Sequence, residues 1–267
     1  MTLLGPLEPV VDRDTVRYAR GFLQHAEVKC KTAAQRKELI DHPLLSTLES
    51  VVTREFALIR SERLPLHRTL GGLSWKNLIE LGEGPPLPKI RRVEVKMTTS
   101  DPGDAALEKL SGLPSLIEAR FELFGAGRTP TTDTWTWLLD GPLRTKRLEI
   151  FTEFSGGRLV GALAALDRRP ETKELVLHLP VSIARDNRDR VYSVQISREK
   201  PGYRVIIHAP EHYLHFTQTV FEKLDRSDVS VEVHPPENKI GTQYEDALVL
   251  MRKAVGDRVS QVAGTSQ

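Results

Sequence analysis

The chain has 267 residues, of which 38 are Lys or Arg and 36 are Asp or Glu, so its net charge is only +2. This balance excludes the strongly charged surface that binds nucleic acid or anionic membranes without specificity. Cys30 is the only cysteine, which excludes an intramolecular disulfide and a cysteine zinc site. No run of apolar residues is long enough for a transmembrane helix, and the first residues lack the pattern of a secretory signal. We therefore expect a cytoplasmic protein with neither a nucleic-acid nor a membrane partner.

Near the amino terminus, residues 13–30 place apolar side chains at helical spacing after an aspartate that could cap a helix. This spacing predicts a helix that covers the first repeat. A second, shorter helix is expected over residues 33–40, immediately before Pro43. Residues 1–42 are therefore interpreted as an amino-terminal helical cap.

Three strand-like segments share one pattern: an apolar residue, any residue, an apolar residue and a histidine, with a proline two places after the histidine. These segments are LVLHLP at 175–180, VIIHAP at 205–210 and VEVHPP at 231–236. A looser version recurs earlier, with a proline several residues before an apolar residue that opens a strand. The apolar anchors fall at 48, 70, 93, 119, 148, 175, 205 and 231, with spacings of 22 to 30 residues. A period of this length indicates a repeat protein over residues 43–236.

Short helices are expected between most of these strands, because apolar residues there recur at every third and fourth position. They fall at 74–81, 104–110, 132–140, 157–166 and 211–224. The segment 191–197 breaks the pattern and predicts an additional strand, either one arm of an antiparallel hairpin or a parallel strand of its own. Residues 243–255 predict a closing helix before a disordered tail from residue 260, so that 237–267 form the carboxyl-terminal cap.

If the anchors lie side by side in a parallel sheet, alternation sends apolar residues to one face at every strand from residue 93 onward. The residues of the opposite face then form columns of alternating charge: Arg92, Glu118, Arg147, Glu174 and Arg204, then Glu94, Arg120 and Glu149, then Lys96 and Glu122. Opposite charges on neighbouring strands stabilise pairing by roughly 0.2–1 kcal/mol each. The alternation of sign therefore predicts a parallel ladder with one buried and one charged face.

Toward the carboxyl end the charged face becomes apolar, aromatic and rich in histidine. The candidate partner-binding residues are Phe151, Val176, His178, Ile206, His208 and His234. An exposed apolar patch of this kind is typical of an interaction surface, so we expect a protein partner. Self-association of an open sheet is a further possibility.

The histidines among these residues also allow a different interpretation. Stacked on neighbouring strands, His178, His208 and His234 could bring three imidazoles together, which is a ligand set that zinc accepts. The alternative function is therefore a metal-binding protein or a metal-dependent enzyme. The chain shows no nucleophile elbow, HExxH or phosphate-binding loop, so the main expectation is a non-enzymatic protein without a cofactor or metal.

The segments HPLLSTLESV at 42–51 and LSGLPSLIEARFELFG at 110–125 resemble the leucine-rich-repeat (LRR) proteins, and most of all the divergent bacterial ones. The resemblance covers roughly residues 40–236. It implies an α/β fold, an irregular LRR-like solenoid with a mostly parallel sheet on one face and short helices on the other. It also implies that the concave sheet face binds proteins and that the fold carries no chemistry of its own.

Overall fold

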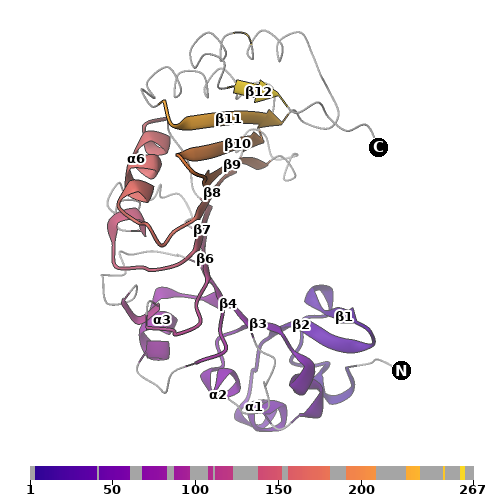
Figure 1. Cartoon of the computed structure of the whole chain (residues 1–267). Helices are drawn as coiled ribbons and strands as arrows, with labels where there is room; N and C mark the ends of the chain where they lie inside the picture. Colours follow the sequence, from indigo (N-terminus) through magenta and orange to yellow (C-terminus); the bar gives the residue numbers. More distant parts are fainter. Residues whose placement is uncertain are drawn as a thin grey trace. The chain divides into compact units, whose positions relative to one another are not determined.

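The computed structural model describes residues 4–40, 42–60, 68–82, 87–96, 108–110, 112–122, 138–151, 156–180, 191–208, 227–234, 249 and 259–261. The chain divides into two compact units. Unit 1 comprises residues 1–126 and 141–145, and unit 2 comprises residues 127–140 and 146–267. The described part of each unit is an α/β structure whose strands lie side by side in chain order, β1 to β6 in unit 1 and β7 to β12 in unit 2 (Figure 1).

Unit 1 begins with an antiparallel hairpin. Strands β1 (Arg17–Ala19) and β2 (Phe22–Val28) are joined at Arg20 and Gly21, whose φ angles of 53° and 81° suit a tight hairpin turn. The helix expected over residues 13–30 is therefore wrong. Leu23, Ala26 and Val28 are the buried residues of β2, and the pairing of residues 25–28 with β3 overrides the helical spacing of the apolar residues. The expected amino-terminal helical cap thus contains a hairpin, together with the correctly predicted helix α1 (Ala33–Ile40).

The middle of unit 1 is a parallel ladder of β2, β3 (Ser50–Thr53), β4 (Thr69–Leu73), β5 (Arg92–Lys96) and β6 (Glu118–Glu122). Val51, Leu70, Val93 and Ala119 are buried and aligned across four strands, as the apolar anchors predict from residue 70 onward. The anchor at Leu48 is wrong by three residues. Leu48 follows the 3-10 helix η3 (Pro43–Thr47) and is fully buried there, while Val51 occupies the lateral position next to Leu70.

Strand β4 contains a bulge. Leu70 pairs with Val93 but Leu73 pairs with Val95, so β4 uses one residue more than β5 over the same length. The extra length is taken up by Gly71 and Gly72, and Gly72 has a φ angle of 73° that favours glycine. Both glycines therefore belong to a true strand of the sheet rather than ending it.

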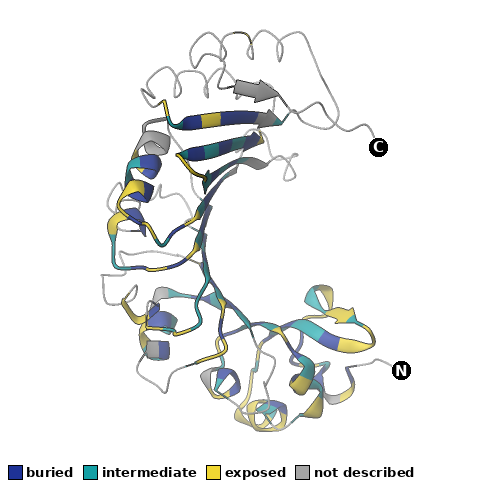
Figure 2. Cartoon of the chain, in the orientation of Figure 1, coloured by how far each residue is buried: buried dark blue, intermediate teal, exposed yellow. Residues whose placement is uncertain are grey.

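Short helices lie on one side of the strands in unit 1. Figure 1 shows α1, α2 (Phe56–Ile59) and α3 (Trp75–Gly82) on the same side of β2 to β4. Helix α3 confirms the helix expected over 74–81. The core between helices and sheet contains the fully buried side chains of Leu58, Leu70 and Phe121. Figure 2 shows the burial of these elements. The opposite side of the sheet, called the open face below, carries the charged columns.

The strands of unit 2 are β7 (Arg147–Phe151), β8 (Glu174–Pro180), β9 (Val191–Arg198), β10 (Tyr203–His208), β11 (Val229–His234) and β12 (Val259–Gln261), and their pairing is mixed. Strand β9 lies between β8 and β10 and is antiparallel to both, so the hairpin interpretation of 191–197 is correct. The remaining pairs described in unit 2 are parallel. Residues 260 and 261 belong to β12 rather than to a disordered tail.

Helix α6 (Gly156–Asp167) confirms the helix expected over 157–166 and lies on one side of the sheet of unit 2 (Figure 1). Its Leu163 and Leu166 are buried, as are Leu175, Val205 and the other inward residues of the strands. The expected helices at 104–110, 132–140, 211–224 and 243–255 lie wholly or mostly outside the described residues. Residues 108–110, 138–140 and 249 are helical where the structure describes them. None of the described helices is long and apolar enough to cross a membrane.

Candidate functional site

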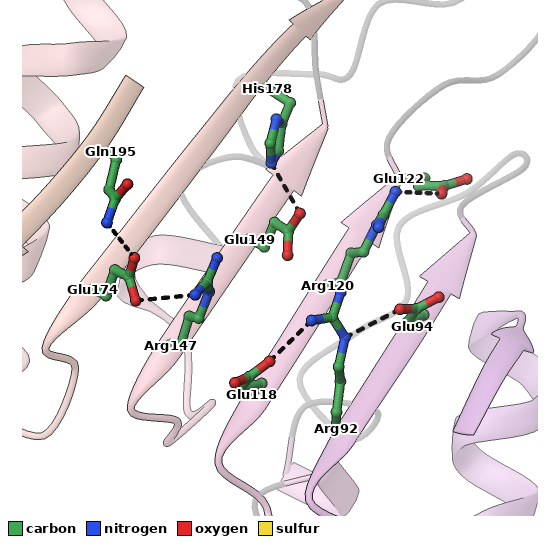
Figure 3. A network of polar contacts seen from close by, with 10 residues as sticks. All are labelled: Arg92, Glu94, Glu118, Arg120, Glu122, Arg147, Glu149, Glu174, His178 and Gln195. Atoms are coloured by element: carbon green, nitrogen blue, oxygen red, sulfur yellow. Dashed lines mark hydrogen bonds and ion pairs between the residues drawn. The ribbon is translucent and has the colours of Figure 1, made fainter. Parts of the chain in front are cut away.

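The open face of unit 1 carries a ladder of ion pairs (Figure 3). Arg92 Nη1 lies 3.0 Å from Glu118 Oε2, and Lys96 Nζ lies 3.2 Å from Glu122 Oε2, in each case between neighbouring strands. Arg120 also pairs with Glu122, at 3.3 Å. These contacts confirm the sign alternation for β5 and β6. Each exposed pair contributes only about 0–1 kcal/mol, so their main effect is to leave this surface nearly neutral.

In unit 2 the predicted column of Arg147, Glu174 and Arg204 also begins with an ion pair between neighbouring strands. Arg147 lies 3.3 Å from Glu174, and the Gln195 side chain donates a hydrogen bond of 2.6 Å to the other oxygen of Glu174 (Figure 3). The expected contact of Glu174 with Arg204 is wrong. Strand β9 is inserted between the two and places Ser197 opposite both of them.

The predicted site residues of unit 2 lie in two rows across the open face. One row reads Phe151, His178, Ser193, His208 and His234, from β7 to β11. The Phe151 and His178 rings are stacked with centroids 4.1 Å apart, and the His208 and His234 rings are tilted with centroids 4.6 Å apart. Ser193 separates these two ring pairs, so the expected column of three consecutive histidines is wrong. The second row reads Glu149, Val176, Gln195, Ile206 and Glu232. We call the four ring residues of the first row, together with Ile206 of the second, the ring row.

A carboxylate holds one imidazole in each ring pair. His178 Nε2 lies 2.9 Å from Glu149 Oε1, and His234 Nε2 lies 2.8 Å from Glu232 Oε1. Both glutamates are buried, with exposed fractions of 8% and 9%. They were not among the predicted site residues, although Glu232 stands two residues before His234 on the same face of its strand. The contacts orient each imidazole and limit the directions from which a ligand can approach it.

The charges around Glu232 also change the pKa values of the cluster. The hydrogen bond from Arg204 is the main cause that lowers the pKa of Glu232, with burial opposing it and His234 adding to it. The pKa of His208 is lowered, first by partial removal from water and then by the neighbouring His234, while Glu232 opposes the change. The His208 ring therefore favours its neutral form.

The apolar members of the predicted site differ in accessibility. Val176 is buried, with an exposed fraction of 5%, so the expected exposure at this position is wrong. It lies between Glu149 and Gln195 on the adjacent strands, and these longer side chains flank it on both sides. Ile206 and Phe151 are partly exposed. Among the predicted apolar residues, it is therefore these two that contribute accessible surface to this face.

The histidine arrangement bears on the metal alternative. Over the part of the chain that the structure describes, no group of three or more His, Cys, Asp and Glu side chains gathers in a way that could hold a metal ion. The separation of His178 from His208 by Ser193 explains why the three imidazoles do not converge.

Unit 1 contains a further candidate site, a hollow of about 570 Å³ at the carboxyl ends of its parallel strands. It is lined by Glu27, Val28, Lys29, Cys30, Val52, Thr53, Arg54, Glu55, Gly72, Glu94, Lys96 and Glu122. None of these residues was among the predicted site residues, although the paired glycines of β4 were a signal for the hollow. Its charged side chains come from residues that are far apart in the chain.

Comparison with known proteins identifies no related protein. No protein-family model, no curated protein and no solved structure matches the chain.

Proposed function

We propose that the chain is a non-enzymatic protein-interaction module that binds a protein partner through the open face of its sheet. The binding residues would be those of the ring row: Phe151, His178, Ile206, His208 and His234, with Val176 supporting them from below. We further propose that the repeated strands and helices form an irregular solenoid of the leucine-rich-repeat type. The repeat pattern of the sequence and the parallel strands within each unit support this proposal.

The observation that carries the proposal is the composition of the open face in unit 2. Core-forming residues of β8 and β10 point to the side of α6, yet the other side presents a phenylalanine, an isoleucine and three imidazoles rather than only charged groups. Aromatic residues are enriched at protein interfaces. Rings already held by neighbouring side chains lose little conformational entropy when a partner binds, which favours them as contact residues.

The charges of the face favour a protein over a nucleic acid. Arg92, Arg147 and Arg204 are each paired with a glutamate on the sheet, so they do not form the basic stripe that phosphate groups require. The alternative of a metal-binding function is not retained, because the described histidines do not form a ligand set.

The proposal is tested by affinity capture with the Ile206→Glu variant. Ile206 is partly exposed in the ring row, and a carboxylate there would have to be desolvated in an interface, which costs several kcal/mol unless it is paired. The matched control is Ile79→Glu, the same substitution at an exposed isoleucine of α3. We expect a specific partner to be recovered with the wild type and with Ile79→Glu but not with Ile206→Glu.

Both variants must keep the circular dichroism spectrum and melting temperature of the wild type for this comparison to hold. Equal recovery of the partner by both variants would contradict the assignment of the binding face. Phe151→Ala is a second variant of the same row and removes the ring that stacks on His178. It should weaken capture without introducing a charge.

A further inference from the structure

The hollow in unit 1 exists because β4 carries no side chain at its bulge. A Cβ atom built on Gly71 would lie 2.9 Å from Val52 Cγ2 and 3.5 Å from Glu94 Oε2, and a Cβ on Gly72 would lie 2.8 Å from Val52 Cγ1. A side chain at either position would therefore require Val52 to shift. The gap left on the open face is bounded by β2 and β3 on one side and by β5 and β6 on the other.

The carboxylates of the hollow are less exposed than its ammonium groups. The side chains of Glu27, Glu94 and Glu122 have exposed fractions of 23%, 32% and 28%, whereas those of Lys29 and Lys96 have 71% and 64%. Glu55 also lines the hollow but is paired with Arg36. Among the lining side chains the carboxylates therefore lie deeper than the ammonium groups, and the exposed Arg54 adds to the basic rim. From outside the lining, Arg92 is paired with Glu94 and Arg120 with Glu122.

The two lysines of the rim can be exchanged, whereas Arg92 and Arg120, which are paired with Glu94 and Glu122, are less exposed and stay in place. Lys29 Nζ lies 2.6 Å from Glu27, and Lys96 Nζ lies 3.2 Å from Glu122. Ion pairs this exposed contribute at most about 1 kcal/mol each, and either ammonium group can return to water by a side-chain rotation. A ligand cation can thus replace Lys29 at Glu27, while Glu94 keeps its contact with Arg92 through Oε1 and offers Oε2 to the ligand.

The shape of the gap favours a guanidinium over an ammonium group. Glu27 is on β2 and Glu94 is on β5. Two strands lie between β2 and β5, so the backbones of these strands are about 14 Å apart. Glu94 Oε2 extends into that gap, since it would lie only 3.5 Å from a Cβ atom built on Gly71. A guanidinium has five N–H donors in one plane and can bond carboxylates on two sides, whereas an ammonium group is a compact point charge.

We propose that this hollow binds an arginine side chain of a protein partner, within a segment that has acidic residues next to the arginine. The carboxylates of Glu27 and Glu94 receive the guanidinium. The rim cations Lys29, Arg54 and Lys96 receive the neighbouring acidic side chains. The proposal rests on the proposed protein-binding function for the kind of ligand, but the site itself belongs to unit 1 and is tested without the partner.

The test uses the full chain and two short peptides in isothermal titration calorimetry. The probe is acetyl-Glu-Arg-Glu-amide, and the control is the same peptide with citrulline in place of arginine, which keeps the shape but removes the charge. We expect saturable binding of the arginine peptide that weakens with added salt, and at least about tenfold weaker binding of the citrulline peptide, since hydrogen bonds to charged groups contribute about 1.5–3 kcal/mol.

Cys30 gives an independent measurement because it is the only cysteine of the chain and lines the hollow. Burial is the main cause that raises the pKa of its thiol, so its reaction with a thiol reagent is followed at mildly alkaline pH. The arginine peptide should slow this reaction in a saturable way, with the same midpoint as the calorimetric titration. The citrulline peptide should leave the rate nearly unchanged.

Substitutions locate the site. Glu27→Gln and Glu94→Gln keep side-chain volume and should each weaken binding of the arginine peptide by about tenfold. The matched control is Glu118→Gln, which removes a carboxylate from the same face of β6 but outside the hollow. It should bind the peptide as the wild type does. Circular dichroism establishes that all three variants are folded.

Absence of saturable binding at millimolar peptide, equal binding of the citrulline peptide, or an equal loss in Glu118→Gln would each overturn the proposal. These outcomes are distinct from failure of the proposed function. If the peptide does not bind but Ile206→Glu still abolishes partner capture, the interaction module stands and only the arginine site is rejected.

Discussion

Replacement of Gly72 by alanine should be one of the most destabilising single-methyl changes in unit 1, for two separable reasons. The φ angle of 73° places an alanine in the left-handed region, which costs roughly 1–2 kcal/mol. The new Cβ would also lie 2.8 Å from Val52 Cγ1, and overpacking of this kind typically costs about 1–3 kcal/mol. We therefore expect Gly72→Ala to reduce the free energy of unfolding by about 2–5 kcal/mol.

A double-mutant cycle with Val52→Ala separates the two contributions. With Val52 truncated the steric contact disappears, and Gly72→Ala should then cost only the roughly 1–2 kcal/mol of backbone strain. The coupling of about 1–3 kcal/mol is what two residues in direct contact can show. Urea unfolding followed by circular dichroism gives the free energies, and hydrogen exchange of peptides from residues 45–60 and 68–82 reports on unit 1 itself.

Gly161→Ala is the control for this cycle. Gly161 is exposed inside helix α6, and a Cβ there would meet no atom within 4 Å. Alanine should stabilise the helix by roughly 0.5–1 kcal/mol, because glycine loses more entropy on folding. The reasoning would be refuted if Gly72→Ala cost the same with and without the valine side chain, since the contact with Val52 would then contribute nothing.

Two other changes test the site in unit 2. Val176→Glu should reduce the free energy of unfolding by about 2–4 kcal/mol, because it places a carboxylate at a position only 5% exposed and next to Glu149; urea unfolding measures this loss, and a change below that of Ile206→Glu would contradict the burial. His208→Gln should make the free energy of unfolding less dependent on pH below about 6.5. The pKa of His208 is lowered in the folded protein, so the unfolded chain binds a proton at a higher pH than the folded protein does. The stability of the wild type therefore falls as the pH drops from about 6.5 toward the lower pKa of the folded state. The urea midpoint of the wild type measured against pH should decline more steeply in this window than that of the variant, and parallel curves would contradict the prediction.

The sequence by itself determined the register of the parallel strands. Alternation of side chains has a period of two, so the apolar residues of RVEVK and EARFE fix which face is buried, and a slip by one residue would bury charge. The alignment of Val93 with Ala119, of Leu148 with Leu175 and of Val205 with Val231 follows from that pattern. The local spacing also predicted helices α3 and α6, because each buries one face of a short segment.

Only the tertiary structure decided which segments become neighbours. Residues 13–30 have helical spacing, but the turn at Arg20 and Gly21 and the lateral pairing with β3 convert them into strands. The insertion of β9 separates His178 from His208, and the flanking side chains of Glu149 and Gln195 bury Val176. Both effects depend on residues that are distant in the chain, so a local pattern does not contain them.

The hollow of unit 1 shows the same limit most clearly. Its lining residues come from five strands and the turns that follow them, and none of the segments has an unusual sequence apart from the paired glycines. Gly71 and Gly72 could be read as a weak strand from the sequence. These glycines open a space large enough for a ligand only because Val52 and Glu94 lie on either side of them. The shape of a surface is set by contacts between strands, and the order of residues along a single strand does not reveal it.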